Sequence, residues 1–317
     1  MKITKEQVKN WEACIDGYRW FLNKFPEGGD YADIHQGLLN DNRFEDAGWL
    51  TEKMYQSFFG TPELPQAEAS AGNKMIETLN NMDMPTVESI SEWCGQQASS
   101  GDWTKQASSG DRTKQASSGN WTQQASSGDW TKQASSGDRT KQASSGDRTK
   151  QASSGNWTQQ ASSGYGTQQA SSGYGTQQAS SGDWTKQASS GDETKQASSG
   201  YGTQQASSGD WTQQASSGDG TRQASSGIGT KHLSTGAFSK VAASGSAVEI
   251  TASGDNSVVA AANSVSKIVL GEGGCASIAY HDGDRTRFAV AYVGENNIKP
   301  NVAYTVNENG EFVQVAD

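Results

Sequence analysis

The feature that most constrains this chain is a nonapeptide that recurs through its middle, as in QASSGDWTKQASSGDRTKQASSGNWTQ over 97–123. Such a fixed period indicates units that stack on their neighbours, because a nine-residue unit cannot bury a core alone. Glycine marks the period and recurs at every ninth position from Gly101 to Gly254. The next position in this register is Asn263, which we interpret as the other residue type that tolerates a left-handed backbone.

The spacing of the repeat survives after its residues diverge. The position three after each glycine is threonine from Thr104 to Thr230, and the same register continues at Ser239, Val248, Ser257 and Ser266. A disordered tract has no reason to keep its spacing once its composition has drifted. The hydrophobic content of 32% is typical of disorder, but ten Trp and only five Pro argue against it. We therefore expect a mainly β protein with a stacked β-solenoid.

The number of residues in one coil has two interpretations. Each unit offers a short strand and a turn, so two units predict a coil of 18 residues and a rod of about 45 Å at ~4.8 Å per coil. The alternative is a coil of 27 residues, because five tryptophans recur at that spacing: Trp103, Trp130, Trp157, Trp184 and Trp211. Trp121 breaks that series, so we favour 18 residues and attribute the series to duplication of 27-residue blocks.

The last repeats indicate which side chains face inward. Val241, Ile250, Val259 and Ile268 share one position, and charged residues lie between such apolar positions, which is period-two alternation. Projected back, the interior of the main array would hold threonine, glutamine and serine, as in Thr104, Gln106 and Ser108. Such an interior needs side-chain ladders that hydrogen-bond from coil to coil. The opposite choice buries Ala107 and Ser109 together with Lys105, and the sequence leaves the two choices open.

The segment before the array reads as helical. Residues 1–60 form a predicted head domain, in which Thr4 caps a first helix that continues to Phe21 or Leu22. Two more helices are predicted over 30–41 and 43–59. Residues 61–95 are interpreted as linker and capping helices: a Pro-containing linker over 60–72, then short helices over 73–81 and 86–97. Trp93 and Cys94 are expected to cover the open first coil.

The remaining chain divides into the solenoid, 96–271, and a small β domain, 272–317. The small domain has predicted strands at 276–281, 287–293, 302–306 and 312–315, with hairpin turns at HDGDR and NENGEF. We expect it to be an antiparallel sheet that closes the end of the solenoid.

Charge and composition exclude several classes of function. The net charge is −10, but the array itself is close to neutral, so the acidity belongs to the ends. No basic stripe for nucleic acid is present, and no apolar run is long enough to predict a membrane span or a secretion signal. Three cysteines far apart predict neither disulfides nor a metal site. We expect a cytoplasmic protein in a reducing compartment.

No combination of residues predicts catalysis. His35, His232 and His281 lie in separate regions without a second ligand at metal-binding spacing, so each is interpreted as a packing or surface residue. The repeats that contain Gly-Asp resemble calcium-binding repeats only in their length of nine residues. Neither a phosphate-binding loop nor a nucleophile motif is found. We therefore expect that the protein is not an enzyme and that it binds neither a cofactor nor a metal.

Two groups of residues are candidates for contact with a partner. The first is the acidic segment 31–49, and the second is the set of aromatic and arginine residues at the turns, which are residue types that anchor interfaces. An equal alternative is that the turn residues shield the coil edges and stack on one another. The candidates are Asp33, Asp41, Arg43, Glu45, Asp46, Trp103, Trp121, Trp130, Arg139, Arg148, Trp157, Trp184 and Trp211.

The array resembles two kinds of protein. SSGYGTQQASSGYGTQQ over 162–178 is similar to the repeats of bacterial ice-nucleation proteins, a resemblance that implies a solenoid with threonine rows facing water. Segments 13–50 and 274–313, together with the Gly-Asp-x-Ser/Thr repeats, resemble a family of phage and prophage repeat proteins. That second resemblance implies a helical head, a solenoid and a β tail, and no catalytic residues.

These observations favour a non-enzymatic β-solenoid scaffold that binds a macromolecular protein complex. In a phage setting, the expected activity is inhibition of a host defence or nucleic-acid-processing complex. Two alternatives remain at this point: an ice-binding or ice-nucleating rod, and a structural component of a virion or surface fibre, including a homo-oligomer joined along the solenoid.

Overall fold

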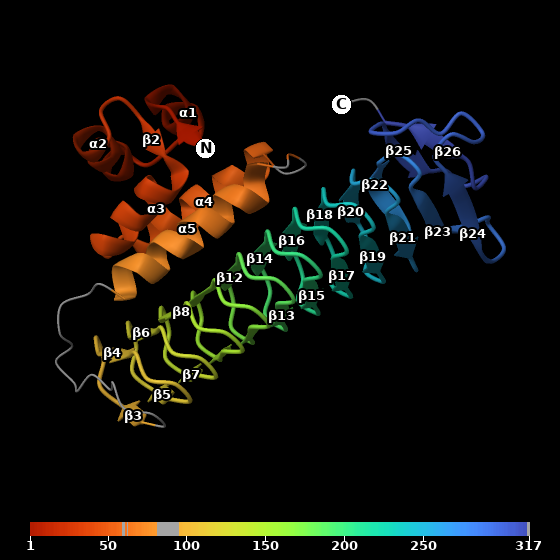
Figure 1. Cartoon of the computed structure of the whole chain (residues 1–317). Helices are drawn as coiled ribbons and strands as arrows, with labels where there is room; N and C mark the ends of the chain where they lie inside the picture. Colours follow the sequence, from red (N-terminus) through yellow and green to blue (C-terminus); the bar gives the residue numbers. More distant parts are fainter. Residues whose placement is uncertain (59–60, 62, 81–94, 316–317) are drawn as a thin grey trace.

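The computed structural model describes residues 1–58, 61, 63–80 and 95–315. Its helices precede a two-sided β-solenoid and lie along one side of it (Figure 1). The helices are α1 Lys5–Asn10, α2 Ile15–Lys24, α3 Tyr31–Asn40, α4 Phe44–Phe58 and α5 Glu63–Asn80. A short antiparallel pair, β1 Lys2–Ile3 and β2 Gly29–Asp30, joins the start of the chain to the start of α3.

The solenoid strands form two long sheets of alternating membership. We call the sheet that faces the helices the covered sheet; it contains β4 Lys105–Ser108, β6 Gln123–Ser126, β8 Lys141–Ser144, β10 Gln159–Ser162, β12 Gln177–Ser180, β14 Lys195–Ser198, β16 Gln213–Ser216, β18 Lys231–Ser234, β20 Val248–Ala252, β22 Val265–Leu270, β25 Ala303–Val306 and β26 Phe312–Gln314. We call the other the open sheet; it contains β3 Gln96–Ser99, β5 Lys114–Ser117, β7 Lys132–Ser135, β9 Lys150–Ser153, β11 Gln168–Ser171, β13 Lys186–Ser189, β15 Gln204–Ser207, β17 Arg222–Ser225, β19 Lys240–Ala243, β21 Val258–Ala261, β23 Cys275–His281 and β24 Thr286–Tyr292.

The helical region differs from the predicted one in two places. Thr4 caps α1 through a capping box with Gln7, but Glu12 has φ 59°, so the predicted first helix is two helices. α3 and α4 lie where they were predicted. The predicted linker over 60–72 is wrong, because α5 runs unbroken from Glu63 to Asn80. Pro65 lies in the first turn of α5, where a missing N–H costs the helix no hydrogen bond. Trp93, Cys94 and most of the predicted capping helix lie outside the described residues.

One coil of the solenoid contains two nonapeptides, as predicted. β10 and β12 are parallel, and Gln159 pairs with Gln177, 18 residues later. The 27-residue alternative is wrong, because successive members of the tryptophan series fall at opposite edges of the solenoid. Trp121, which breaks the series, is the residue stacked on Trp103, with ring centroids 4.8 Å apart and an interplanar angle of 9°.

The interior of the array is polar, and its glutamines form hydrogen-bonded ladders. Gln169, which is 2% exposed, donates from Nε2 to Gln151 Oε1 at 2.9 Å and to the carbonyl oxygen of Ala179 at 3.0 Å. Gln187 Nε2 in turn donates to Gln169 Oε1 at 2.9 Å. Threonine and serine fill the rest of the interior; Thr149, for example, is 1% exposed. This confirms the interior projected from the last repeats.

The final coils exchange this polar interior for an apolar one. Val241, Ile250, Val259 and Ile268 form a buried cluster with residues of the chain end. The end itself is not a separate sheet. The hairpin of β23 and β24 continues the open sheet, and β25 and β26 continue the covered sheet, so each sheet closes with antiparallel strands (Figure 1).

The left-handed position in each turn is not the repeated glycine. It is the residue two positions later, such as Trp103 at φ 61° or Gly175 at φ 63°. The repeated glycine is required for another reason: a Cβ on Gly119 would lie 2.0 Å from the carbonyl oxygen of Gly101 in the preceding coil. The interpretation of Asn263 as a left-handed residue is therefore wrong. Its φ is not positive, and the register shifts by one residue in the next strand, where Val265 pairs with Val248.

Candidate partner-binding surfaces

In the repeat array, the two sheets present the same Gln-Ala-Ser pattern to opposite sides of the solenoid, and they differ in whether lysine, arginine or glutamine precedes it. On the covered sheet, most repeat alanines are buried beneath the helical region; Ala143 is 0% and Ala161 is 1% exposed, whereas Ala107 and Ala179 are half-buried. α5 contacts six successive strands of this sheet, from β6 to β16. The alanines at the same position of the open sheet, such as Ala134 and Ala170, are exposed. The helical region therefore covers one alanine face, whereas the corresponding face of the open sheet, which we call the bare face, is exposed.

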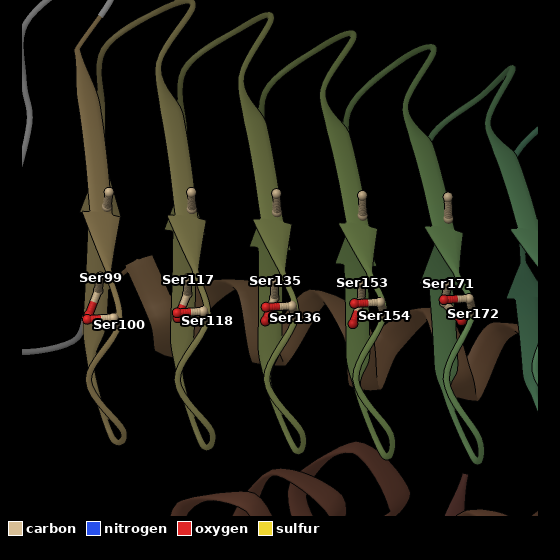
Figure 2. Close-up of a pocket in the computed structure, with 15 residues that line it drawn as sticks. Ser99, Ser100, Ser117, Ser118, Ser135, Ser136, Ser153, Ser154, Ser171 and Ser172 are labelled. Carbon is tan, nitrogen blue, oxygen red and sulfur yellow. The ribbon is translucent and has the colours of Figure 1, made fainter.

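The bare face is hollowed into a continuous groove. Its first part has a volume of about 770 Å³ and its second about 830 Å³, and the two share Ala170 and Ser171. The floor repeats one alanine and two serines per strand, and the second part ends at Phe288 of β24. Figure 2 shows the serine pairs, from Ser99 and Ser100 onward, recurring in register along this face.

The turn residues fall on two edges, of which only one lies beside α4. On this helix-side edge, Trp121 packs against Phe44 with ring centroids 4.8 Å apart, and the Arg139 guanidinium lies 4.8 Å from the Trp121 ring. On the far edge, Arg148 stacks in the same way on Trp130, at 4.8 Å. Several predicted turn candidates therefore contact one another. Those that keep large exposed areas are Trp103, Trp130, Trp157, Trp184 and Trp211.

Asp41 and Asp33, two of the predicted acidic candidates, are bound within the chain. Asp41 accepts hydrogen bonds from Trp20 Nε1 at 2.7 Å and from Lys24, and the Trp20 bond is the main cause that lowers the pKa of its carboxyl. Asp33 pairs with Lys74 of α5.

The other acidic-segment candidates join α2, α4 and the solenoid edge. Arg43 bridges Asp16 and Asp46, at 2.7 and 2.6 Å. Glu45 binds Arg139 of the solenoid at 3.3 Å. These contacts fasten the helical region internally and to the solenoid edge.

Sequence reasoning missed a buried polar cluster between the helical region and the covered sheet. Tyr31 donates to Glu68 at 2.7 Å, and burial raises the pKa of Glu68 to about 7. Lys141 is 4% exposed, donates to the carbonyl oxygen of Leu39 at 3.3 Å, and has its pKa lowered to about 7 by burial. Nothing in the repeat marks Lys141, because the exposed lysines of the open sheet occupy the same repeat position.

The buried histidines agree with a packing role. His35 lies in this same layer, and burial lowers its pKa to about 4. His232 takes the interior position of a glutamine, where burial lowers its pKa to about 3. Among the described residues, no group of three or more His, Cys, Asp or Glu side chains could hold a metal ion. No helix in the described part of the chain has the length and apolar character needed to cross a membrane.

A second groove lies between α4 and the helix-side edge. Its volume is about 420 Å³, and its lining includes Trp49 and Glu52 of α4 with Trp157, Glu193 and Trp211 of the solenoid turns. The burial of Lys195 beside it lowers the pKa of that lysine. The sequence named two of these tryptophans as candidates but could not place α4 opposite them.

Comparison with known proteins finds similarity at the start of the chain. Residues 1–59 match the family model described as the YdhT N-terminal domain. The chain is also 58% identical over 50 residues to an uncharacterized protein YdhT of Escherichia coli (strain K12). That match covers 16% of this chain and 18% of the relative, so the chain spans less than a fifth of the length of the curated protein it matches. No solved structure matches the chain significantly.

Proposed function

We propose that this protein is a non-enzymatic scaffold that binds a protein partner on the bare face of its open sheet. The observation that carries the proposal is the difference between two faces that repeat the same alanine and serine pattern. The chain covers one alanine and serine face with its own helix and leaves the other exposed along the array. Exposed surfaces of this extent commonly mark interaction sites.

The covered face suggests the shape of the partner. α5 approaches the alanine row closely through small residues: a Cβ on Gly72 would lie 3.1 Å from the Cβ of Ala179 and 3.5 Å from that of Ala161. Ala71 is buried at the same interface. An α-helix with a similar small-residue stripe fits the open sheet for the same steric reason, so we propose a helical segment as the partner element.

The finer proposal is that this partner belongs to a bacterial defence or nucleic-acid-processing complex. It rests on the resemblance to phage proteins, and it assigns the scaffold to the bacterial cytoplasm. The ice-binding alternative would need rows of exposed threonine, whereas Thr113, Thr149 and Thr194 face the interior and are at most 1% exposed. No observation in the described part of the chain favours a fibre role.

Affinity capture from bacterial lysate, with and without nuclease, tests the proposal. We expect one stoichiometric protein partner, retained after nuclease and lost from the double variant Ala134→Arg with Ala170→Arg. The matched control is Tyr165→Arg with Ile228→Arg, which adds the same charge at exposed turns and should retain the partner. Retention by the alanine-row variant, or capture of no protein at all, contradicts the proposal.

A further inference from the structure

The groove between α4 and the helix-side edge has aromatic walls that the molecule does not fill. Trp157 is 42% and Trp211 is 62% exposed. The turn positions that follow these tryptophans in the next coil are Gly175 and Gly229, and each lies against the preceding indole. On α4, a Cβ on Gly48 would lie 3.8 Å from the Trp157 ring. Glycine at all three positions keeps the groove open.

The lining of the groove is rich in hydrogen-bond acceptors. Glu52 and Glu193 contribute carboxylates from opposite walls, and Glu193 accepts a hydrogen bond from Tyr174, which is the main cause that raises the pKa of that tyrosine to about 12. The side-chain oxygen of Gln213 has no hydrogen-bond donor. Of the two lysines in the lining, Lys231 is held by Glu249 at 3.0 Å, outside the groove. Lys195 is half-buried, and burial lowers its pKa while the charges of Glu52, Glu68 and Glu193 act to raise it.

The same edge already shows what such a combination binds. Earlier along it, the Arg139 guanidinium lies over Trp121 and pairs with Glu45 of α4. An indole face and a carboxylate thus hold one guanidinium between the solenoid and the helix. Arg148 stacks on Trp130 at the far edge in the same way. In both places where an arginine follows a tryptophan in the next coil, the guanidinium lies over the indole ring.

At Trp157 and Trp211 the arginine is replaced by glycine, while the carboxylates remain. We infer that this groove binds the guanidinium of an arginine side chain supplied by a partner protein. Trp157 and Trp211 lie three coils apart, about 14 Å, so one guanidinium would stack on one of the two indoles while Glu52 or Glu193 accepts its N–H groups. The site is separate from the bare face of the open sheet, so the inference holds whether or not a helix docks there.

Indole N–H resonances of the ¹⁵N-tryptophan-labelled full chain test the inference with a defined probe, acetyl-Gly-Arg-Gly-amide. We expect the Trp157 and Trp211 signals to shift saturably at millimolar peptide. Trp184 is the internal control, because it packs against Tyr201 and Gly202 as Trp157 packs against Tyr174 and Gly175, but its far edge faces no helix. Its signal should stay in place.

Two matched reagents test whether binding needs the positive charge of the peptide and the carboxylate of the groove. The citrulline peptide has the same shape without the charge, and Glu193→Gln keeps an acceptor for Tyr174 while removing the carboxylate. Each should weaken binding by about tenfold, the loss expected for one charge-assisted hydrogen bond. Equal shifts with citrulline, equal shifts at Trp184, or no shift at about 20 mM peptide, beyond the millimolar range of weak contacts, would overturn the inference.

Discussion

At the scale of single residues, the polar interior works because glutamine can both donate and accept. Each amide donates to the glutamine of the preceding coil and to a main-chain carbonyl, and it accepts from the following coil, as Gln160 does. The alternation that points these side chains inward was readable from Val241 and Ile250. The sequence could not decide between burying Gln106 and burying Lys105, because the decision depends on a ladder that exists only between stacked coils.

A single break in this ladder should be costly. Gln169→Leu removes two donated hydrogen bonds and leaves the amide of Gln187 without its acceptor. We expect a loss of about 2–4 kcal/mol in the free energy of unfolding, measured by urea denaturation. The control is Gln168→Leu, one residue away on the exposed side of the same strand, which should change stability by less than about 0.5 kcal/mol. Equal effects of the two substitutions would count against the ladder.

Lys141 predicts a pH dependence. Burial lowers its pKa from 10.5 to about 7 in the folded chain. As pH falls from 10.5 toward 7, this lysine becomes protonated in the unfolded chain but not in the folded one, so the native protein loses stability. Below pH 7 the lysine is protonated in both states, and the lost stability does not return. Lys141→Met removes the loss, and Leu39 keeps a donor in the Asn42 N–H. We expect the variant to exceed the native protein by about 1–3 kcal/mol at pH 6 and to differ little at pH 10.

The control for this experiment is Lys150→Met, the same residue at the same repeat position of the open sheet, where the side chain is exposed. Thermal denaturation at both pH values should show no comparable gain. Glu68, whose pKa is also near 7, titrates in every variant, so the difference between variants isolates the lysine. A gain for Lys141→Met that does not depend on pH would refute the assignment.

At the scale of elements, α5 shows why a segment can be misread. Its proline and its run of small residues are typical of a linker when only local preference is considered. The same small residues allow the helix to approach the alanine row, so Ala71 and Gly72 are interface residues. Helix α4 was predictable because its apolar spacing is strong. The groove beside it was not, because it depends on two elements more than 90 residues apart, as the pair Glu45 and Arg139 shows.

Gly72→Leu should therefore unseat α5, since even a Cβ at this position would lie 3.1 Å from Ala179. We expect faster amide hydrogen exchange throughout α5 and a lower melting temperature, with the solenoid strands of the final coils still protected. Ser70→Leu places the same side chain on the exposed side of the helix and should leave exchange unchanged. Protection of α5 in the Gly72 variant would show that the helix tolerates a wider separation.

At the scale of the whole molecule, the solenoid has two faces with the same alanine and serine pattern but different surroundings. The architecture of a helical region followed by a β-solenoid was predictable from the period alone. The choice of which sheet the helices cover was not, because β10 and β11 have identical sequences, Gln-Gln-Ala-Ser. That choice is made by the position of the helical region relative to the first coil.

Insertions can test this arrangement. A copied 18-residue coil, 182–199, should lengthen the rod by about 4.8 Å and keep each terminal hairpin on its sheet. A copied nonapeptide, 182–190, should move β26 to the opposite face, a displacement of about 10 Å. Spin labels at positions 70 and 313, in a chain whose native cysteines are replaced by serine, measure both distances. Equal distances in the two insertion variants would rule out the two-sided coil.

The apolar coils stand at the C-terminal end of the array, and this position has a consequence for synthesis. A ribosome delivers the glutamine-filled coils before Val241, Ile250 and the rest of the final cluster exist. Solenoids grow from a stable nucleus by adding neighbours. During translation, the helical region can therefore serve as an apolar template for the emerging repeats, and we expect stacking to begin under α5. The final coils would then add apolar stabilisation to an array that is already stacked.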